Sequence, residues 1–373
     1  MSPDSSTSGA LVLHIAPWAV RGGCEINCLR VIEATPEQRH RVVVLGGPGP
    51  MVEAWQGAGA EVDVLDIWSR GWVYFVLELR RWWRAFPCQP IGILCWSTAR
   101  LPGVLWALQG ASVPWVVHAG NPAPAGFAAR FKLIVWNLFL PARGPFVLAA
   151  CSNPVANSFT GQPFYWRARI VVVPNPIPAV PPVDTGANDP SPRIGMVARL
   201  DPIKDHASLL RSLPLVVARF PSLRFELVGD GILRGKLEAL ATSLGVGQNV
   251  RFLGEVQDVR AAVEGWSLFV YATSAAEGFG NALAEALMAG LPCVASDLPV
   301  MREVCGEHGA HYVSPDDPAA LAEAVIDLLG NAAARRSLGQ AARSRALAHF
   351  QSRTVAVRYL ALLQMSGYAA SES

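Results

Sequence analysis

The residues best suited to do chemistry lie in one segment, from Glu277 to Asp297, with the sequence EGFGNALAEALMAGLPCVASD. This segment follows an apolar, strand-like run, and Gly278 and Gly280 allow its backbone to approach a ligand closely. We predict that a helix opens at Gly280–Asn281. The free backbone amides and the dipole of such a helix favour anionic oxygens, so the segment predicts a phosphate site at a helix N-terminus.

Two glutamates accompany the predicted phosphate site. Glu277 directly precedes it, and Glu285 lies about one turn inside the helix. A carboxylate beside a phosphate must accept hydrogen bonds from some other group, and sugar and ribose hydroxyls are the natural donors. Glu285 alone is explained as well by a solvated helix residue. Together with Glu277 and the glycines, it indicates a nucleotide-sugar ligand.

The pattern E-G-F-G-x-x-x-x-E-A-x-x-x-G-x-P resembles the hallmark of the family 4 retaining glycosyltransferases, which have the GT-B fold. Three further segments resemble motifs of that family and occur in the family's order. They are the glycine loop RGGCEINCL at 21–29, the element PNPI at 174–177, and the segment GMVARLDPIK at 195–204. The resemblance covers about residues 20 to 300, and it depends on four motifs in register rather than on any one of them.

The resemblance implies which residues bind the donor diphosphate. Arg199 and Lys204 would bind the phosphates and offset the charge that builds on the leaving group. Two fixed cations would make a metal ion or any other cofactor unnecessary. Gly22 and Gly23 would present backbone amides to the same diphosphate from the first domain. Taken singly, such residues are more often surface charges or turn glycines.

The resemblance also implies which residues contact the sugars. Glu277 would contact the transferred sugar, and Glu285 would hold the ribose hydroxyls. His118, at the end of the strand-like run PWVVH, matches the family histidine that approaches the donor sugar, although a lone histidine there is more often a packed one. Backbone contacts to the substrate would come from Gly278, Phe279, Gly280 and Asn281.

The rest of the chain supplies the elements that must position these residues. Short β-rich runs alternate with helix-length segments, which predicts parallel sheets covered on both faces. The strand-like runs of the first half are 11–15, 41–45, 61–65, 91–95, 115–118, 146–150 and 170–173; those of the second half are 193–198, 224–228, 250–253, 268–271, 293–295 and 310–313. Two or three helices are expected from Pro318 to about Gln364.

A proline-dense stretch, PNPIPAVPPVDTGANDPSP, interrupts this alternation near the middle of the chain. We therefore predict an α/β protein of the GT-B type, with two Rossmann-like, doubly wound domains that face a central cleft. The expected organisation is an acceptor-binding domain over 1–176, a linker over 177–192, a donor-binding domain over 193–350, and a C-terminal helix over 351–373 that can pack back on the first domain.

Composition narrows the class of protein. The chain has 373 residues, of which 51% are hydrophobic and 16% charged, so it is not an intrinsically disordered protein. The formal net charge of +2 argues against bulk nucleic-acid binding. Seven cysteines without a CxxC pair predict neither disulfides nor structural zinc. Without a signal peptide or a membrane-spanning segment in the sequence, we expect a cytoplasmic protein.

Residues 67–176 form a basic, tryptophan-rich flank in which Glu78 is the only acidic residue. Its densest part is GWVYFVLELRRWWRAF at 71–86. Arginine interleaved with tryptophan suits an anionic membrane surface, and it predicts a peripheral protein at the inner face of the membrane. The alternative is a buried helix with arginines at its rim. No nucleic-acid recognition motif accompanies the flank. Its basic residues are Arg70, Arg80, Arg81, Arg84, Arg100, Arg130, Lys132, Arg143, Arg167 and Arg169.

We therefore predict a retaining, metal-independent glycosyltransferase that moves a sugar from a nucleotide-diphosphate donor to a glycan or lipid-linked acceptor. Such a reaction would belong to cell-surface polysaccharide or glycolipid synthesis. A sugar-nucleotide epimerase, a phosphorylase of the same fold and a non-catalytic nucleotide-sugar-binding protein remain alternatives. The sequence leaves open the donor base (UDP or GDP), the sugar, the acceptor, the linkage and the oligomeric state.

Overall fold

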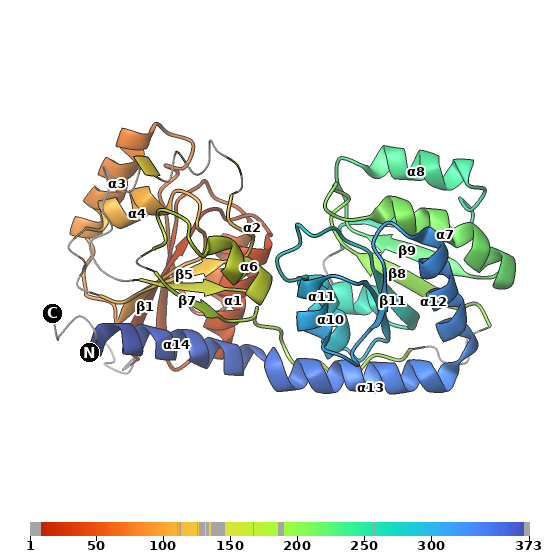
Figure 1. Cartoon of the computed structure of the whole chain (residues 1–373). Coiled ribbons are helices and arrows are strands. Elements are labelled where there is room, and N and C mark those ends of the chain that lie inside the picture. The colour runs from red at the N-terminus through yellow and green to blue at the C-terminus, as the bar shows by residue number, and fades with distance from the viewer. Residues whose placement is uncertain are drawn as a thin grey trace, which may run out of the picture. The chain divides into compact units, whose positions relative to one another are not determined.

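The computed structural model describes residues 9–368, apart from residues 110, 112, 125, 127–130, 132–133, 136–145, 167, 186–189 and 257. The chain divides into two compact units, each built from a parallel sheet with helices on its faces (Figure 1). Unit 1 comprises Met1–Pro176 and Ser352–Ser373, and unit 2 comprises Ile177–Gln351. The α/β class predicted from the alternation of strands and helices is confirmed.

The described part of unit 1 holds a seven-stranded sheet in the order β3-β2-β1-β4-β5-β6-β7. The strands are β1 Leu11–Ala16, β2 Arg39–Val44, β3 Glu61–Val64, β4 Gly92–Cys95, β5 Trp115–Ala119, β6 Val147–Ala150 and β7 Arg169–Val172. The helices are α1 Gly23–Ala34, α2 Pro50–Gly57, α3 Trp72–Arg84, α4 Leu101–Ala107, α6 Asn153–Phe159 and α14 Ser352–Tyr368. The strand order reverses between β1 and β4, where doubly wound folds bind their ligands.

Unit 2 holds a six-stranded sheet in the order β10-β9-β8-β11-β12-β13, counted over its described residues. The strands are β8 Arg193–Val197, β9 Arg224–Val228, β10 Val250–Gly254, β11 Trp266–Tyr271, β12 Cys293–Ser296 and β13 His311–Val313. The helices are α7 His206–Arg219, α8 Arg234–Ser243, α9 Val259–Val263, α10 Asn281–Met288, α11 Pro299–Cys305, α12 Pro318–Gly330 and α13 Ala332–His349. Here the strand order reverses between β8 and β11.

Every strand predicted from the sequence is present, with ends that differ by at most two residues. The central strands are apolar because helices cover both sheet faces; β1, for example, is buried along its whole length. The polar exception in β1 is His14, whose Nε2 lies 3.0 Å from Nδ1 of His40 on the neighbouring β2. The indole of Trp96 donates to Nδ1 of His14 at 3.0 Å, and Nε2 of His40 donates to the carbonyl of Thr35. This buried chain of polar groups is therefore hydrogen bonded.

From Ile177 onward, the described residues of the proline-rich stretch belong to unit 2. The amide of Ile177 donates to the carbonyl of Phe350 at 2.7 Å, and the amide of Val183 donates to that of Ala289 at 3.0 Å. Prolines leave this stretch with few amides to pair in a sheet, so it runs along the unit as an irregular segment.

The last helix, α14, belongs to unit 1 although unit 2 precedes it in the chain. Val355, Ala356, Tyr359 and Leu363 on α14 are buried in the same core as β1 and β4. Leu363 fits against β4 because residue 92 is glycine: a Cβ there would lie 2.6 Å from a methyl of Leu363. Residues 352–363 thus complete the unit that begins at the N-terminus.

Candidate functional site

The N-terminus of α10 lies beside the carboxyl ends of β8 and β11, where the strand order of unit 2 reverses. The helix begins at Asn281 after Gly280, whose φ of 87° is in the left-handed region. A Cβ at Gly280 would also lie 3.2 Å from the ring of Tyr271. Phe279 is buried and its ring packs edge-on against Phe350, with centroids 5.4 Å apart. Because the side chain of Phe279 is buried, the backbone amides of residues 278–281 are the groups of this turn that suit a ligand.

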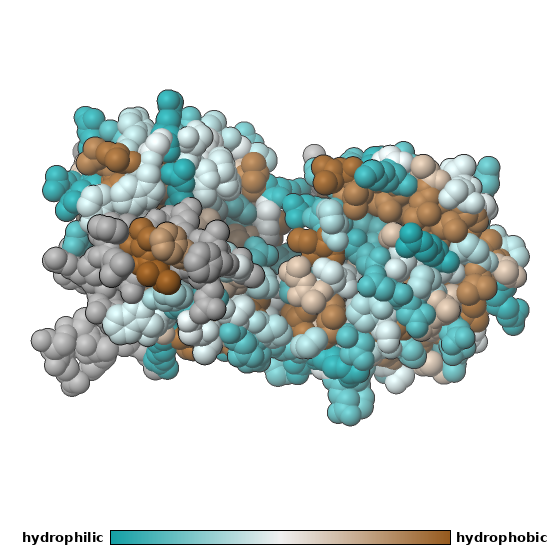
Figure 2. Space-filling model, turned by 45° about the horizontal axis from the view of Figure 1, so that its top comes forward, coloured by the Kyte–Doolittle hydropathy of each residue, from teal (hydrophilic) through white to brown (hydrophobic). Residues whose placement is uncertain are grey.

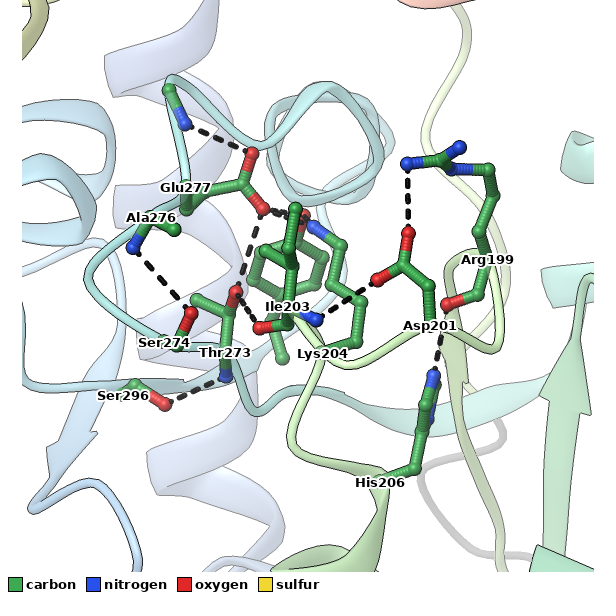
Figure 3. Close-up of polar contacts among 12 residues, drawn as sticks. Arg199, Asp201, Ile203, Lys204, His206, Thr273, Ser274, Ala276, Glu277 and Ser296 are labelled. Atoms are coloured by element: carbon green, nitrogen blue, oxygen red, sulfur yellow. Dashed lines mark hydrogen bonds and ion pairs between the residues drawn. The ribbon is translucent and has the colours of Figure 1, made fainter. Parts of the chain in front are cut away.

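Lys204 and Glu277 are brought together from loops that follow neighbouring strands (Figure 3). Lys204 pairs with Thr273 in an isolated antiparallel bridge, and the amide of Ser274 donates to the carbonyl of Ile203 at 2.9 Å. These backbone contacts align the two loops. As a result Nζ of Lys204 forms an ion pair with Oε2 of Glu277, and both side chains are only 13% exposed.

Tyr271, at the end of β11, is a third member of this cluster that the sequence analysis did not identify. Its hydroxyl accepts from Nζ of Lys204 at 2.6 Å and donates to Oε2 of Glu277 at 2.9 Å. The ammonium also lies over the tyrosine ring, 4.7 Å from its centroid. A tyrosine in a buried strand has no motif to mark it, but its position six residues before Glu277 was a usable signal.

The three groups influence one another's ionisation. Burial alone would raise the pKa of Glu277, but the charge of Lys204 and hydrogen bonds from Lys204, Tyr271 and the amide of Phe279 bring that pKa below its ordinary value. Burial and the nearby carboxylate of Glu277 hold the pKa of Tyr271 well above its usual range. At neutral pH the cluster therefore holds a carboxylate and a neutral phenol.

Arg199 follows β8 and presents its guanidinium to solvent, with 78% of its side chain exposed. Its Nη2 lies 2.7 Å from Oδ2 of Asp201, while Oδ1 of Asp201 accepts from the amide of Ile203 at 3.1 Å (Figure 3). Nε2 of the buried His206 donates to the carbonyl of Arg199 at 3.1 Å. These hydrogen bonds fix the backbone of Arg199. Its guanidinium, which pairs with Asp201, must leave that carboxylate to bind another anion.

Glu285 lies half-buried on α10. Its charge contributes to the raised pKa of Tyr271, so it belongs to the same neighbourhood. Unit 2 thus brings together Arg199, Lys204, Glu277, the turn 278–281 and Glu285 around one sheet edge. The predicted roles of these residues toward a substrate stay predictions.

The remaining predicted residues, Gly22, Gly23 and His118, lie in unit 1. Helix α1 begins at Gly23, directly after Gly22. A Cβ at Gly22 would lie 2.5 Å from Oε2 of Glu25, so a side chain there would displace this carboxylate. Burial raises the pKa of Glu25. Unit 1 therefore also presents a helix N-terminus at its strand-order reversal.

His118 lies on β5 and is buried. Its Nδ1 is 2.9 Å from the hydroxyl of Tyr359 on α14, and burial lowers its pKa to about 4. No described residue hydrogen bonds to its Nε2. A Cβ at Gly120 would lie 3.0 Å from that nitrogen and 3.5 Å from Sγ of Cys24, which places Nε2 near the first turn of α1. His118 is thus a neutral imidazole whose buried Nε2 has no hydrogen-bond partner among the described residues.

Some tryptophans of the basic flank, residues 67–176, are packed inside unit 1. Trp96 and Trp115 are buried, and Trp72 stacks on Trp106 with centroids 5.5 Å apart. Helix α3 nevertheless exposes Val73, Tyr74 and Leu77, followed by Arg81 and Arg84 toward its end. Figure 2 shows apolar side chains on the surfaces of both units. Arg130, Lys132, Trp136, Arg143 and Arg167 lie outside the described residues.

The described residues bear on whether this chain holds a metal ion and whether it spans a membrane. They contain no group of three or more histidine, cysteine, aspartate or glutamate residues arranged to hold a metal ion. They also contain no helix both long and apolar enough to cross a membrane.

Residues 191–331 match the profile of the family described as glycosyl transferases group 1. A phosphatidyl-myo-inositol mannosyltransferase of Mycobacterium tuberculosis is 40% identical over 141 residues, which are 35% of this chain and 36% of that protein. A GDP-mannose-dependent monoacylated alpha-(1-6)-phosphatidylinositol monomannoside mannosyltransferase of Corynebacterium glutamicum is 30% identical over 187 residues, 48% of this chain and 49% of that protein. The matches thus span about half or less of these relatives' length.

Solved structures resemble the whole fold. HepE of Anabaena in complex with UDP and glucose has a TM-score of 0.80 at 17% identity, with 95% of this chain and 100% of that chain covered. A glycosyltransferase from Rickettsia africae has a TM-score of 0.78 at 15% identity, with 96% and 99% covered. Both comparisons show the GT-B arrangement of two Rossmann-like units. Residues 191–331, which carry the EGFG turn, Lys204 and Glu277, are therefore similar to the glycosyl transferases group 1.

Proposed function

We propose that this chain is a glycosyltransferase that moves a sugar from a nucleotide-diphosphate sugar to a glycan or lipid-linked acceptor. The observation that carries the proposal is the convergence of Lys204 and Glu277 beside the N-terminus of α10. A cation and free helix amides suit a diphosphate, and a carboxylate next to them suits sugar hydroxyls.

In the proposed reaction, the bond from the anomeric carbon to the diphosphate breaks while the acceptor oxygen bonds to the same carbon. Lys204 and Arg199 offset the charge on the leaving diphosphate. Glu277 holds the transferred sugar. Glu285 accepts from the ribose.

We propose retention of the anomeric configuration and independence of metal ions as parts of the same mechanism. The acceptor attacks from the face that the leaving group vacates, and its proton passes to the departing phosphate. The two cations of unit 2 serve as the positive charge that Mg²⁺ supplies elsewhere. NMR of the product decides the first point, because an inverted anomeric centre would refute retention. Turnover that EDTA abolishes and Mg²⁺ restores would refute the second.

We propose further that the acceptor is carried by lipid and that unit 1 meets an anionic membrane at its inner face. The curated relatives named above carry phosphatidylinositol acceptors in their names, and α3 exposes apolar residues next to arginines. Such a surface places apolar groups at headgroup depth and cations toward phosphates.

Thermal unfolding with UDP, GDP, ADP and their common sugar conjugates, in the presence of EDTA, tests the proposed function first. A ligand at a hundredfold excess over its Kd adds about 2.7 kcal/mol of stability. A shift with one nucleotide identifies the donor base, and transfer from its sugar conjugates to extracted lipids then identifies the acceptor. If none of these nucleotides shifts the transition or binds by calorimetry, the proposed function is wrong.

A further inference from the structure

Both cations assigned to the donor diphosphate are already held by carboxylates of unit 2. Arg199 pairs with Asp201, and Lys204 pairs with Glu277 (Figure 3). A diphosphate that takes either cation must therefore compete with an internal anion. The affinity of the site for a diphosphate therefore depends on which hydrogen bonds each carboxylate keeps once its cation has moved away.

Asp201 is anchored independently of Arg199. Its Oδ1 accepts from the amide of Ile203 at 3.1 Å, its own amide donates to the carbonyl of Arg199 at 2.9 Å, and its carbonyl accepts from the amide of Lys204 at 3.1 Å. Only 17% of its side chain is exposed. The carboxylate therefore stays in place when the guanidinium swings to a ligand, and it competes with that ligand for Arg199.

Glu277 is anchored by other donors as well. Apart from Lys204, its Oε2 accepts from the hydroxyl of Tyr271 at 2.9 Å and from that of Thr273 at 3.5 Å, and its Oε1 accepts from the amide of Gly278 at 3.2 Å. When Lys204 turns to a phosphate, these donors keep the buried carboxylate hydrogen bonded. Without the phenol, the departure of Lys204 would leave Oε2 with the long contact to Thr273, which is costly for a buried charge.

We propose that a nucleoside diphosphate binds this chain by exchange of ion pairs. Asp201 is the internal competitor that weakens nucleotide binding through Arg199, and Tyr271 is a positioning residue that stabilises Glu277 after Lys204 has left it. The proposal rests on the proposed function, because it takes the ligand to be a nucleoside diphosphate. Asp201 and Tyr271 thus have opposite effects on the affinity for the nucleotide.

The test compares the nucleotide affinities of Asp201→Asn and Tyr271→Phe by calorimetry with UDP and GDP. Asparagine keeps an oxygen for the amide of Ile203 but removes the charge, so we expect the Kd to fall about three- to tenfold. Phenylalanine keeps the ring but removes the hydroxyl, so we expect the Kd to rise about three- to tenfold. The matched control is Asp317→Asn, because Asp317 accepts from the amide of Ala320 at 2.9 Å at the start of α12. We expect no change there.

A double-mutant cycle separates competition for Arg199 from a general perturbation of the loop. In an Arg199→Ala background, the gain from Asp201→Asn should shrink to within about twofold. Asp201→Ser, which also offers an oxygen to the amide of Ile203, replaces Asp201→Asn if thermal unfolding shows that the latter misfolds. Equal weakening of binding by Asp201→Asn and Tyr271→Phe, or no change with either, overturns ion-pair exchange. If the unaltered chain binds neither UDP nor GDP, the proposed function itself is wrong. That result differs from one in which the unaltered chain binds a nucleotide but the two variants do not change the Kd in opposite directions.

Discussion

The hydroxyl of Tyr359 lies 2.9 Å from Nδ1 of His118, although 241 positions separate the two residues in the chain. The phenol donates to Nδ1 when the proton of the neutral imidazole sits on Nε2, the nitrogen without a described partner. In the other tautomer the phenol accepts from Nδ1, so in either case helix α14 holds the histidine that the family resemblance assigns to the donor sugar.

Tyr359→Phe should lower kcat about tenfold while leaving the Kd for the free nucleotide unchanged, because the phenol acts on the sugar contact and not on the diphosphate. The measurement is transfer kinetics beside calorimetry with UDP and GDP. The matched control is Tyr165→Phe in the same unit. A purely structural role for Tyr359 would instead lower Tm with kcat preserved at a permissive temperature.

Lys204→Ala should reduce turnover by about 10²- to 10³-fold, since it removes a fixed cation from the leaving diphosphate. Lys236→Ala on the exposed face of α8 serves as the control and should be silent. Initial rates at saturating donor check the expectation. An unchanged rate would remove Lys204 from the mechanism.

Gly280→Ala should lower the free energy of unfolding by about 1–2 kcal/mol, because alanine is strained at a φ of 87°. Nucleotide binding should weaken with it, since the first turn of α10 would shift. Denaturant unfolding and calorimetry measure the two effects. Gly235→Ala in α8, where an added Cβ meets nothing within 4 Å, should cost no stability; an equal loss in both variants would contradict the strain argument.

Acidification should destabilise unit 1 through its buried histidines. Burial and the neighbouring His40 hold the pKa of His14 well below its ordinary value of 6.5, and burial lowers the pKa of His40 as well. The unfolded chain therefore binds more protons as the pH falls below 6.5, and the free energy of unfolding falls over that range.

Urea unfolding between pH 7.5 and pH 5 measures this slope. His14→Gln should flatten it, whereas His308→Gln, at a histidine that is 81% exposed, should leave it unchanged. A slope that His14→Gln does not alter would show that other groups govern the pH dependence.

The exposed face of α3 should bind vesicles that contain phosphatidylserine at low salt and bind neutral phosphatidylcholine vesicles weakly. Leu77→Asp combined with Arg81→Glu should abolish this binding. Leu215→Asp, at a 54% exposed leucine in unit 2, should have no effect. Co-sedimentation reports both, and an unaltered chain that ignores anionic vesicles would refute the membrane proposal.

The strands and the start of α10 were predictable because both depend on local patterns. Continuous apolar runs specify buried parallel strands, and Gly280 specifies the turn into the helix. The family resemblance placed Lys204 and Glu277 at one ligand, but it did not predict a contact between them. The ion pair itself arises from the pairing of two loops that are 73 residues apart.

Tyr359 and the pair of His14 with His40 could not be predicted, and Tyr271 was missed although it lies six residues before Glu277. Each acquires its role from a partner on a different element, which no local sequence pattern marks. The sequence also gave no reason to assign Asp201 a partner, because a loop aspartate beside an arginine is usually solvated.

The return of α14 to unit 1 has a consequence for how the protein is made. A ribosome releases every residue of unit 2 before it releases Val355, Tyr359 and Leu363, which fill the core of unit 1. The first half of the nascent chain therefore keeps part of its apolar core exposed until α14 emerges, whereas unit 2 can already fold. The domain that is synthesised first is the one that matures last.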